Sequence, residues 1–124
     1  MLAIKSSIAR KDDISTLIFD EIDTGISGRT AQRVAEKMSE IARYRQVICI
    51  THLPQIAAMA DRHFAIEKST TDGRTGTAVT SLSEDEAVDE LARLLSGSET
   101  TDTTIGLARE MKEQADAFKR SAAD

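Results

Sequence analysis

The distribution of apolar and polar residues predicts strands and helices in alternation. Two short runs rich in β-branched and aliphatic side chains, at residues 14–20 and 46–51, are typical of strands. Residues 29–44 between them predict a helix, because their apolar side chains recur at helical spacing. Its apolar positions are Ala31, Val34, Ala35, Met38, Ile41 and Ala42. A strand, a helix and a strand in this order predict a parallel pair with a crossover helix.

The first of these strand runs does not alternate between apolar and polar residues at its centre. The sequence Leu17-Ile18-Phe19 is continuously apolar, which predicts a strand buried on both faces. Further along, runs at residues 62–68 and 77–82 predict an antiparallel hairpin. Its turn is expected at residues 69–76, which contain two glycines.

Four more helices are predicted along the chain. Pro54 fits the first turn of a helix to about residue 60, where its missing N–H costs nothing. Ser83 and Glu86 form a capping-box pattern for a helix at residues 84–95. A last helix is expected at residues 103–121, and one more at the start, at residues 1–10. The predicted inner faces comprise Ala87, Val88, Leu91, Leu94, Leu95, Ile105, Ala108, Met111, Ala115 and Phe118.

Length and composition indicate one α/β domain over residues 1–124. The formal net charge is −5 and no run of basic residues occurs, which argues against this chain alone gripping nucleic acid. The single cysteine, Cys49, lies in an apolar strand and suits a buried thiol in a reducing cytoplasm. No segment has the pattern of a membrane span.

The strongest chemical signal is a pair of carboxylates at the end of the first strand. Asp20 and Glu21 precede a turn with two glycines at residues 22–28. In parallel α/β sheets ligands bind at the carboxyl ends of strands. The first carboxylate of such a pair typically holds Mg²⁺, and the second can act as a general base toward water. His52 follows the second strand, so we expect its imidazole at the same edge.

Two segments together resemble the RecN family of bacterial DNA repair ATPases, which is SMC-like and of the ABC type. Residues 17–28, LIFDEIDTGISG, resemble the Walker B strand and D-loop, and residues 51–57, THLPQIA, resemble the switch-histidine segment. Residues 1–5 and 90–97 also resemble parts of that family. The resemblance implies the C-terminal lobe of an ABC/SMC-type P-loop ATPase head. Such a lobe has mainly parallel strands flanked by helices, a β-hairpin and C-terminal helices.

The resemblance also implies roles for individual residues, with ATP and Mg²⁺ as cofactors. Asp20 would bind Mg²⁺, Glu21 would polarise the attacking water, and His52 would touch the γ-phosphate. The D-loop would contact a second subunit across an ATP sandwich. The implied cofactor-binding residues are Asp20, Asp23, Thr24, Gly25, Ser27 and Gly28. Implied partners are the N-terminal lobe of the same protein, a second copy, and DNA through the full-length protein rather than through this acidic chain alone. The implied location is cytoplasmic and nucleoid-associated.

The sequence contains no Gly-x-x-x-x-Gly-Lys-Ser/Thr, so we expect the chain to be the C-terminal piece of a larger ATPase. Several alternatives stay open. The isolated chain can be inactive and serve as an interaction module for its missing lobe and a partner subunit. A Toprim-type metal site would use Asp20 and Asp23, although their spacing fits it poorly. An ATPase lobe of another SMC or ABC protein, including a transporter, would share the carboxylates and the histidine.

Overall fold

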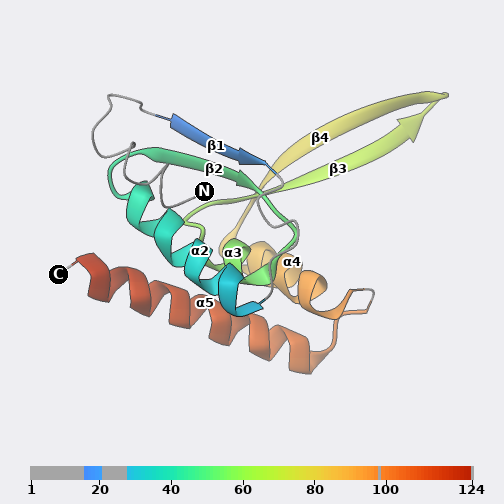
Figure 1. Ribbon diagram of the computed structural model, residues 1–124. Coiled ribbons are helices and arrows are strands. Elements are labelled where there is room, and N and C mark those ends of the chain that lie inside the picture. Colours follow the sequence, from blue (N-terminus) through green and yellow to red (C-terminus); the bar gives the residue numbers. More distant parts are fainter. Residues whose placement is uncertain (1–15, 21–27, 98, 124) are drawn as a thin grey trace.

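The computed structural model describes residues 16–20, 28–97 and 99–123 (Figure 1). The predicted helix at residues 1–10 lies outside the described residues. The described elements, in chain order, are β1 (Thr16–Asp20), α2 (Gly28–Ala42), β2 (Gln46–Ile50), α3 (Pro54–Met59), β3 (His63–Thr71), β4 (Arg74–Leu82), α4 (Glu84–Ser96) and α5 (Asp102–Ala123). Among them, no helix is long and apolar enough to cross a lipid bilayer.

The predicted strand–helix–strand unit is confirmed. Strands β1 and β2 pair in parallel, with Thr16 opposite Gln46 and Asp20 opposite Ile50. Helix α2 connects them and buries four residues of the predicted apolar stripe, Ala31, Ala35, Met38 and Ile41, whereas Val34 is partly buried and Ala42, at its end, is exposed. Phe19, which is only 3% exposed, projects from β1 into the main core. The other buried residues of this core are Ala35, Met38, Ile56, Met59 and Ala115.

The outer face of the parallel pair departs from the prediction. Ile18 on β1 is 65% exposed, and Ile48 and Ile50 on β2 are each 44% exposed. The expectation of a first strand buried on both faces is therefore wrong for the described residues. The reason is visible in Figure 1, where the described helices lie on the opposite side of the pair.

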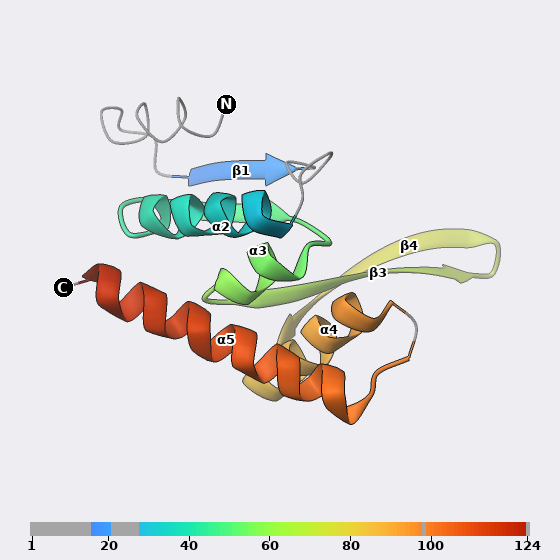
Figure 2. The ribbon, with the colours of Figure 1, turned by 60° about the horizontal axis from the view of Figure 1, so that its bottom comes forward.

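The second strand pair is an antiparallel hairpin, as predicted, but its turn is shorter than expected. The strands continue to Thr71 and resume at Arg74, so the turn consists of Asp72 and Gly73 alone. Both residues have positive φ, 52° and 75°, which suits Asp-Gly in a two-residue turn. The described strands thus form two separate two-stranded sheets, the predicted parallel pair and the predicted hairpin. The hairpin projects from the body of the molecule (Figures 1 and 2), and residues 67–81 are all exposed.

Helices α4 and α5 form a second, smaller core against α3. Its buried residues are Ala58, Val88, Leu91, Ala92 and Ala108. The predicted capping box of α4 is confirmed, since Ser83 and Glu86 each bond the other's backbone N–H. The far end of α5 is fixed by Lys119, whose Nζ donates to the backbone carbonyl of Met59 at 3.2 Å and to Asp61 Oδ1 at 2.9 Å. This ties α5 to the chain leaving α3.

Candidate functional site

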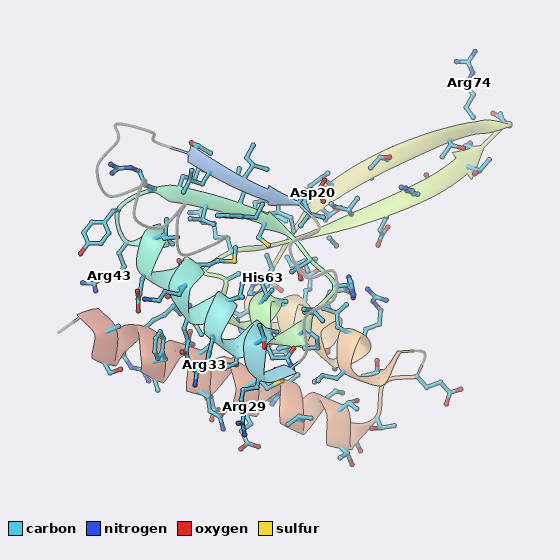
Figure 3. All side chains as sticks on the ribbon, viewed as in Figure 1. Asp20, Arg29, Arg33, Arg43, His63 and Arg74 are labelled. Carbon is cyan, nitrogen blue, oxygen red and sulfur yellow. The ribbon has the colours of Figure 1, made fainter. Side chains whose placement is uncertain are left out.

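The carboxyl edge of the parallel pair brings two of the predicted site residues to the same end of the sheet. Asp20 is the last residue of β1 and lies opposite Ile50, the last residue of β2 (Figure 3). His52 follows Ile50 by two residues, and both Asp20 and His52 are exposed. The predicted placement at one edge is confirmed for these two residues, whereas their chemical roles stay predictions.

A short, well-anchored turn leads from β2 past His52 into α3. The Thr51 hydroxyl oxygen accepts a hydrogen bond from the backbone N–H of Leu53 at 3.0 Å. Pro54 then occupies the start of α3, where no backbone donor is needed. Ile56, one turn further, is buried in the main core. The segment that carries His52 is therefore held between a side-chain hydrogen bond and a buried apolar anchor.

The first residue of α2 lies against the first turn of α3. A Cβ atom added at Gly28 would lie 3.4 Å from the Nε2 atom of Gln55, which is van der Waals contact distance. The end of the segment that follows the carboxylates thus meets the segment that follows His52. Gly28 is one of the predicted cofactor-binding residues, whereas no sequence pattern assigns a role to Gln55. Only the packing of α3 on α2 reveals this neighbour.

The remaining predicted site residues lie outside the described part of the chain. They are Glu21, Asp23, Thr24, Gly25 and Ser27. The Toprim alternative, which needs Asp23 beside Asp20, depends on the same segment. The expected base and the expected D-loop contacts accordingly stay predictions from sequence.

The chemistry of Asp20 fits the hydrated magnesium ion that the family resemblance implies. Its carboxylate is exposed at the sheet edge and forms no salt bridge with any described residue. Mg²⁺ in phosphate sites is typically held by one or two carboxylates, with water and phosphate oxygens completing the octahedron. Within the described residues, no group of three or more His, Cys, Asp or Glu side chains could hold a metal.

The second histidine, His63, lies away from this edge at the start of β3 and is half-buried. Its Nε2 atom is 2.7 Å from the carbonyl oxygen of Ala57, so this nitrogen donates. Burial lowers the pKa of His63 below its usual value. The hydrogen bond to Ala57 opposes that shift, and the positive charge of Lys112 adds to it. His63 therefore connects the hairpin to α3 as a largely neutral side chain at neutral pH.

Sequence comparison relates the chain to one group of curated proteins, although no family model matches it. It is 52% identical to the DNA repair protein RecN of Bacillus subtilis (strain 168) over 119 residues, which are 96% of this chain and 21% of that protein. It is 46% identical to RecN of Haemophilus influenzae over 110 residues, and 44% identical to RecN of Deinococcus radiodurans over 111. These matches cover 89% and 90% of this chain. The chain spans about one fifth of the length of these relatives.

Structural comparison gives a consistent result. One solved chain, described as "Structural biochemistry of ATP-driven dimerization and DNA stimulated activation of SMC ATPases", is similar with a TM-score of 0.61 and 29% sequence identity. The similarity covers 76% of this chain and 56% of that one. The described fold is therefore similar to part of an SMC ATPase.

Proposed function

Because this chain is homologous over nearly its whole length to part of the DNA repair protein RecN, we propose that it forms one half of an ATP-hydrolysing site in an SMC-like DNA repair ATPase. The observation that supports this proposal best is that Asp20 and His52 both lie at the carboxyl edge of β1 and β2. Ligands of parallel α/β sheets bind at this edge. The similarity to an SMC ATPase structure supports the same assignment.

Each residue has a distinct task in this proposal. Asp20 would hold a hydrated Mg²⁺, which neutralises charge on the phosphate oxygens when bound. Glu21 would accept a proton from the attacking water as the new bond to phosphorus forms. His52 would donate a hydrogen bond to a γ-phosphate oxygen. Gln55, packed against Gly28, would keep the segments on either side of the edge in register.

The rest of the site would come from outside this sequence. No P-loop lysine is present, so most phosphate contacts would be supplied by an N-terminal lobe of the longer protein. The D-loop residues would contact a second copy across the bound nucleotide. They are Asp23, Thr24, Gly25, Ser27 and Gly28. The longer protein would bind DNA, in the cytoplasm and at the nucleoid.

A second candidate function is that of an interaction module without activity of its own. It is favoured by the apolar outer surfaces of both strand pairs. Ile18 lies opposite Ile48 on the open face of the parallel pair. On the hairpin, Ile66 lies opposite Val79, and both side chains are exposed. Such surfaces are typical of an interface, here with the rest of the longer protein. The two functions are compatible, one for the whole protein and the other for this chain alone.

Glu21→Gln in the full-length protein tests the proposed catalytic function. The amide keeps the size of the side chain but cannot take the proton, so ATP binding should persist while hydrolysis slows by about 10²-fold or more. ATP binding by calorimetry and phosphate release measure the two effects. Asp72→Asn in the hairpin turn is the control, and it should leave turnover unchanged. Unchanged turnover in Glu21→Gln would remove Glu21 from the role of base.

The same assay on the 124-residue chain tests whether the site needs phosphate contacts from another lobe. Under both candidate functions the isolated chain should show no ATP turnover by itself. Turnover by the isolated chain would contradict the requirement for phosphate contacts from another lobe.

A further inference from the structure

Helix α2 exposes two arginines that lack partners within the described part of the chain. Arg29 and Arg33 are one helical turn apart, and both are exposed on the outer side of α2 (Figure 3). No hydrogen bond or salt bridge to a described residue involves either side chain. The later cations of the same helix region differ. Lys37 pairs with Glu40 at 3.2 Å, and Arg43 donates to the carbonyl oxygen of Ala122 at 2.6 Å.

The positions of the two arginines are electrostatically unfavourable for the helix. Like charges four residues apart on a helix repel each other. Cations near the start of a helix also face the positive end of its dipole, and the first turn of α2 has no acidic residue to offset them. The first two turns of the helix therefore carry two positive charges that form no ion pair with a described residue.

The surroundings of the pair favour a negatively charged partner. An open hollow along the outer side of α2 is lined by Arg29, Gln32, Arg33, Glu36, Lys37 and Glu40. At its far end Lys37 forms an ion pair with Glu40, and the Glu36 carboxylate accepts a hydrogen bond from Gln32 at 3.4 Å. At the near end both guanidinium groups stay available. The planar guanidinium binds phosphate through two parallel hydrogen bonds, which makes phosphate a well-matched ligand.

We propose that Arg29 and Arg33 form a contact for the phosphodiester backbone of DNA in the longer protein. The proposal rests on the proposed function for the presence of DNA. The chain as a whole carries a net charge of −5, so it repels a polyanion at long range. A contact with DNA at this lobe consequently needs local cations that are not already paired, and α2 supplies two of them side by side. The contact carries no sequence information, because phosphates are the same along every duplex.

The salt dependence of DNA binding by the full-length protein tests the contact directly. Each neutralised phosphate contributes about 0.9 to the slope of log affinity against log salt concentration. The double variant Arg29→Ala/Arg33→Ala should therefore lower the magnitude of the slope by about 1.8, and it should weaken binding equally for duplexes of unrelated sequence. Fluorescence anisotropy with a labelled duplex across a salt series measures the slope.

Two matched variants make the result specific. Lys37→Ala lies on the same helix but removes a cation that Glu40 already neutralises, so the slope should keep its wild-type value. Arg29→Lys/Arg33→Lys keeps both charges and should keep most of the slope. If the lysine variant loses the slope as fully as the alanine variant, the change comes from a disturbed helix, and the proposal is overturned.

Other outcomes also decide the question. If the alanine variant keeps the wild-type slope of log affinity against log salt concentration, the proposed DNA contact is overturned. If it keeps this slope but no longer forms a dimer, Arg29 and Arg33 instead bind an acidic surface of a second copy. Turnover of ATP without DNA should persist in the alanine variant. A wild-type protein without ATP turnover would refute the proposed function separately, whatever the DNA slope shows.

Discussion

The two strand pairs of this molecule are built in opposite ways. β1 and β2 are five residues each, far apart in sequence, and pair in parallel with one face packed on the main core. β3 and β4 are nine residues each, joined by a two-residue turn, and largely exposed. The parallel pair depends on tertiary packing for its existence. The hairpin depends on its own backbone pairing and its turn.

The predicted site residues lie on the packed parallel pair and not on the exposed hairpin. Asp20 and His52 are carried by the pair that is anchored through Phe19, Ile56 and α2. Reactive groups on a packed scaffold keep their positions with little loss of conformational entropy. The outer half of the hairpin carries mainly Ser, Thr and Gly, which suits a surface that contacts solvent or a partner.

The largest expected effect comes from breaking the packed face of the parallel pair. Phe19→Ala should lower the free energy of unfolding by about 3–5 kcal/mol, because it empties a buried position between β1 and α2. Ile18→Ala, at the next position on the open face, should cost under about 1 kcal/mol. Urea denaturation of the 124-residue chain measures both. Equal losses at the two positions would show that the outer face is also buried.

A smaller effect of about 1–2 kcal/mol is expected at the hairpin turn. Gly73→Ala forces a side chain into the left-handed region, at φ 75°, and should increase local opening of the hairpin. Gly76→Ala is the matched control. It has open space and no positive φ, so the substitution should be neutral or stabilise by up to about 1 kcal/mol. Hydrogen exchange of the β3 and β4 amides measures the two changes. If both substitutions increased amide exchange equally, the turn at Asp72 and Gly73 would not be what stabilises the hairpin.

The smallest expected effect is a dependence of stability on pH at His63, where the hairpin joins the helices. Lys112 and Lys119 face this histidine from α5, and Glu84 faces it from α4. Because the pKa of His63 is lowered in the folded chain, the unfolded chain binds a proton more readily. The contribution of neutral His63 to the free energy of unfolding is therefore complete above the usual pKa of 6.5, and it is lost as the pH falls below that value.

Melting temperatures of the 124-residue chain between about pH 7.5 and about pH 5.5 test this sign. His63→Gln keeps a hydrogen-bond donor for the Ala57 carbonyl but has no proton to gain. It should make the melting temperature less sensitive to pH over this range. A variant with the same pH dependence as the wild type would exclude His63 as its source.

Local patterns predicted the fold wherever the determining residues lie close together in sequence. The capping box of Ser83 and Glu86 needs only four residues, and the apolar stripe of α2 needs only its own periodicity. The predicted turn at residues 69–76 is longer than the observed one, because Gly73 and Gly76 together suggest a wide loop. The dipeptide Asp72-Gly73 alone specifies a two-residue turn, and this signal was available in the sequence.

Predictions that depend on what covers a surface were less successful. The apolar run through Ile18 correctly indicated a strand, but a run of this kind cannot show whether a second layer is present in the same chain. The shared edge of Asp20 and His52 followed from parallel pairing alone. The approach of Gln55 to Gly28 did not, because it arises from the packing of α3 on α2.

The long connection between β1 and β2 also has a consequence for the order of folding. Thr16 and Gln46, which face each other at the start of the pair, are 30 residues apart, and their side chains bond at 3.0 Å. The entropy lost on closing such a loop must be offset by the packing of α2, whereas a hairpin with a tight turn forms within about 1–10 μs. During synthesis Asp20 therefore emerges well before the strand that leads to His52. We therefore expect the edge that would bind nucleotide to form late, after the crossover helix has docked.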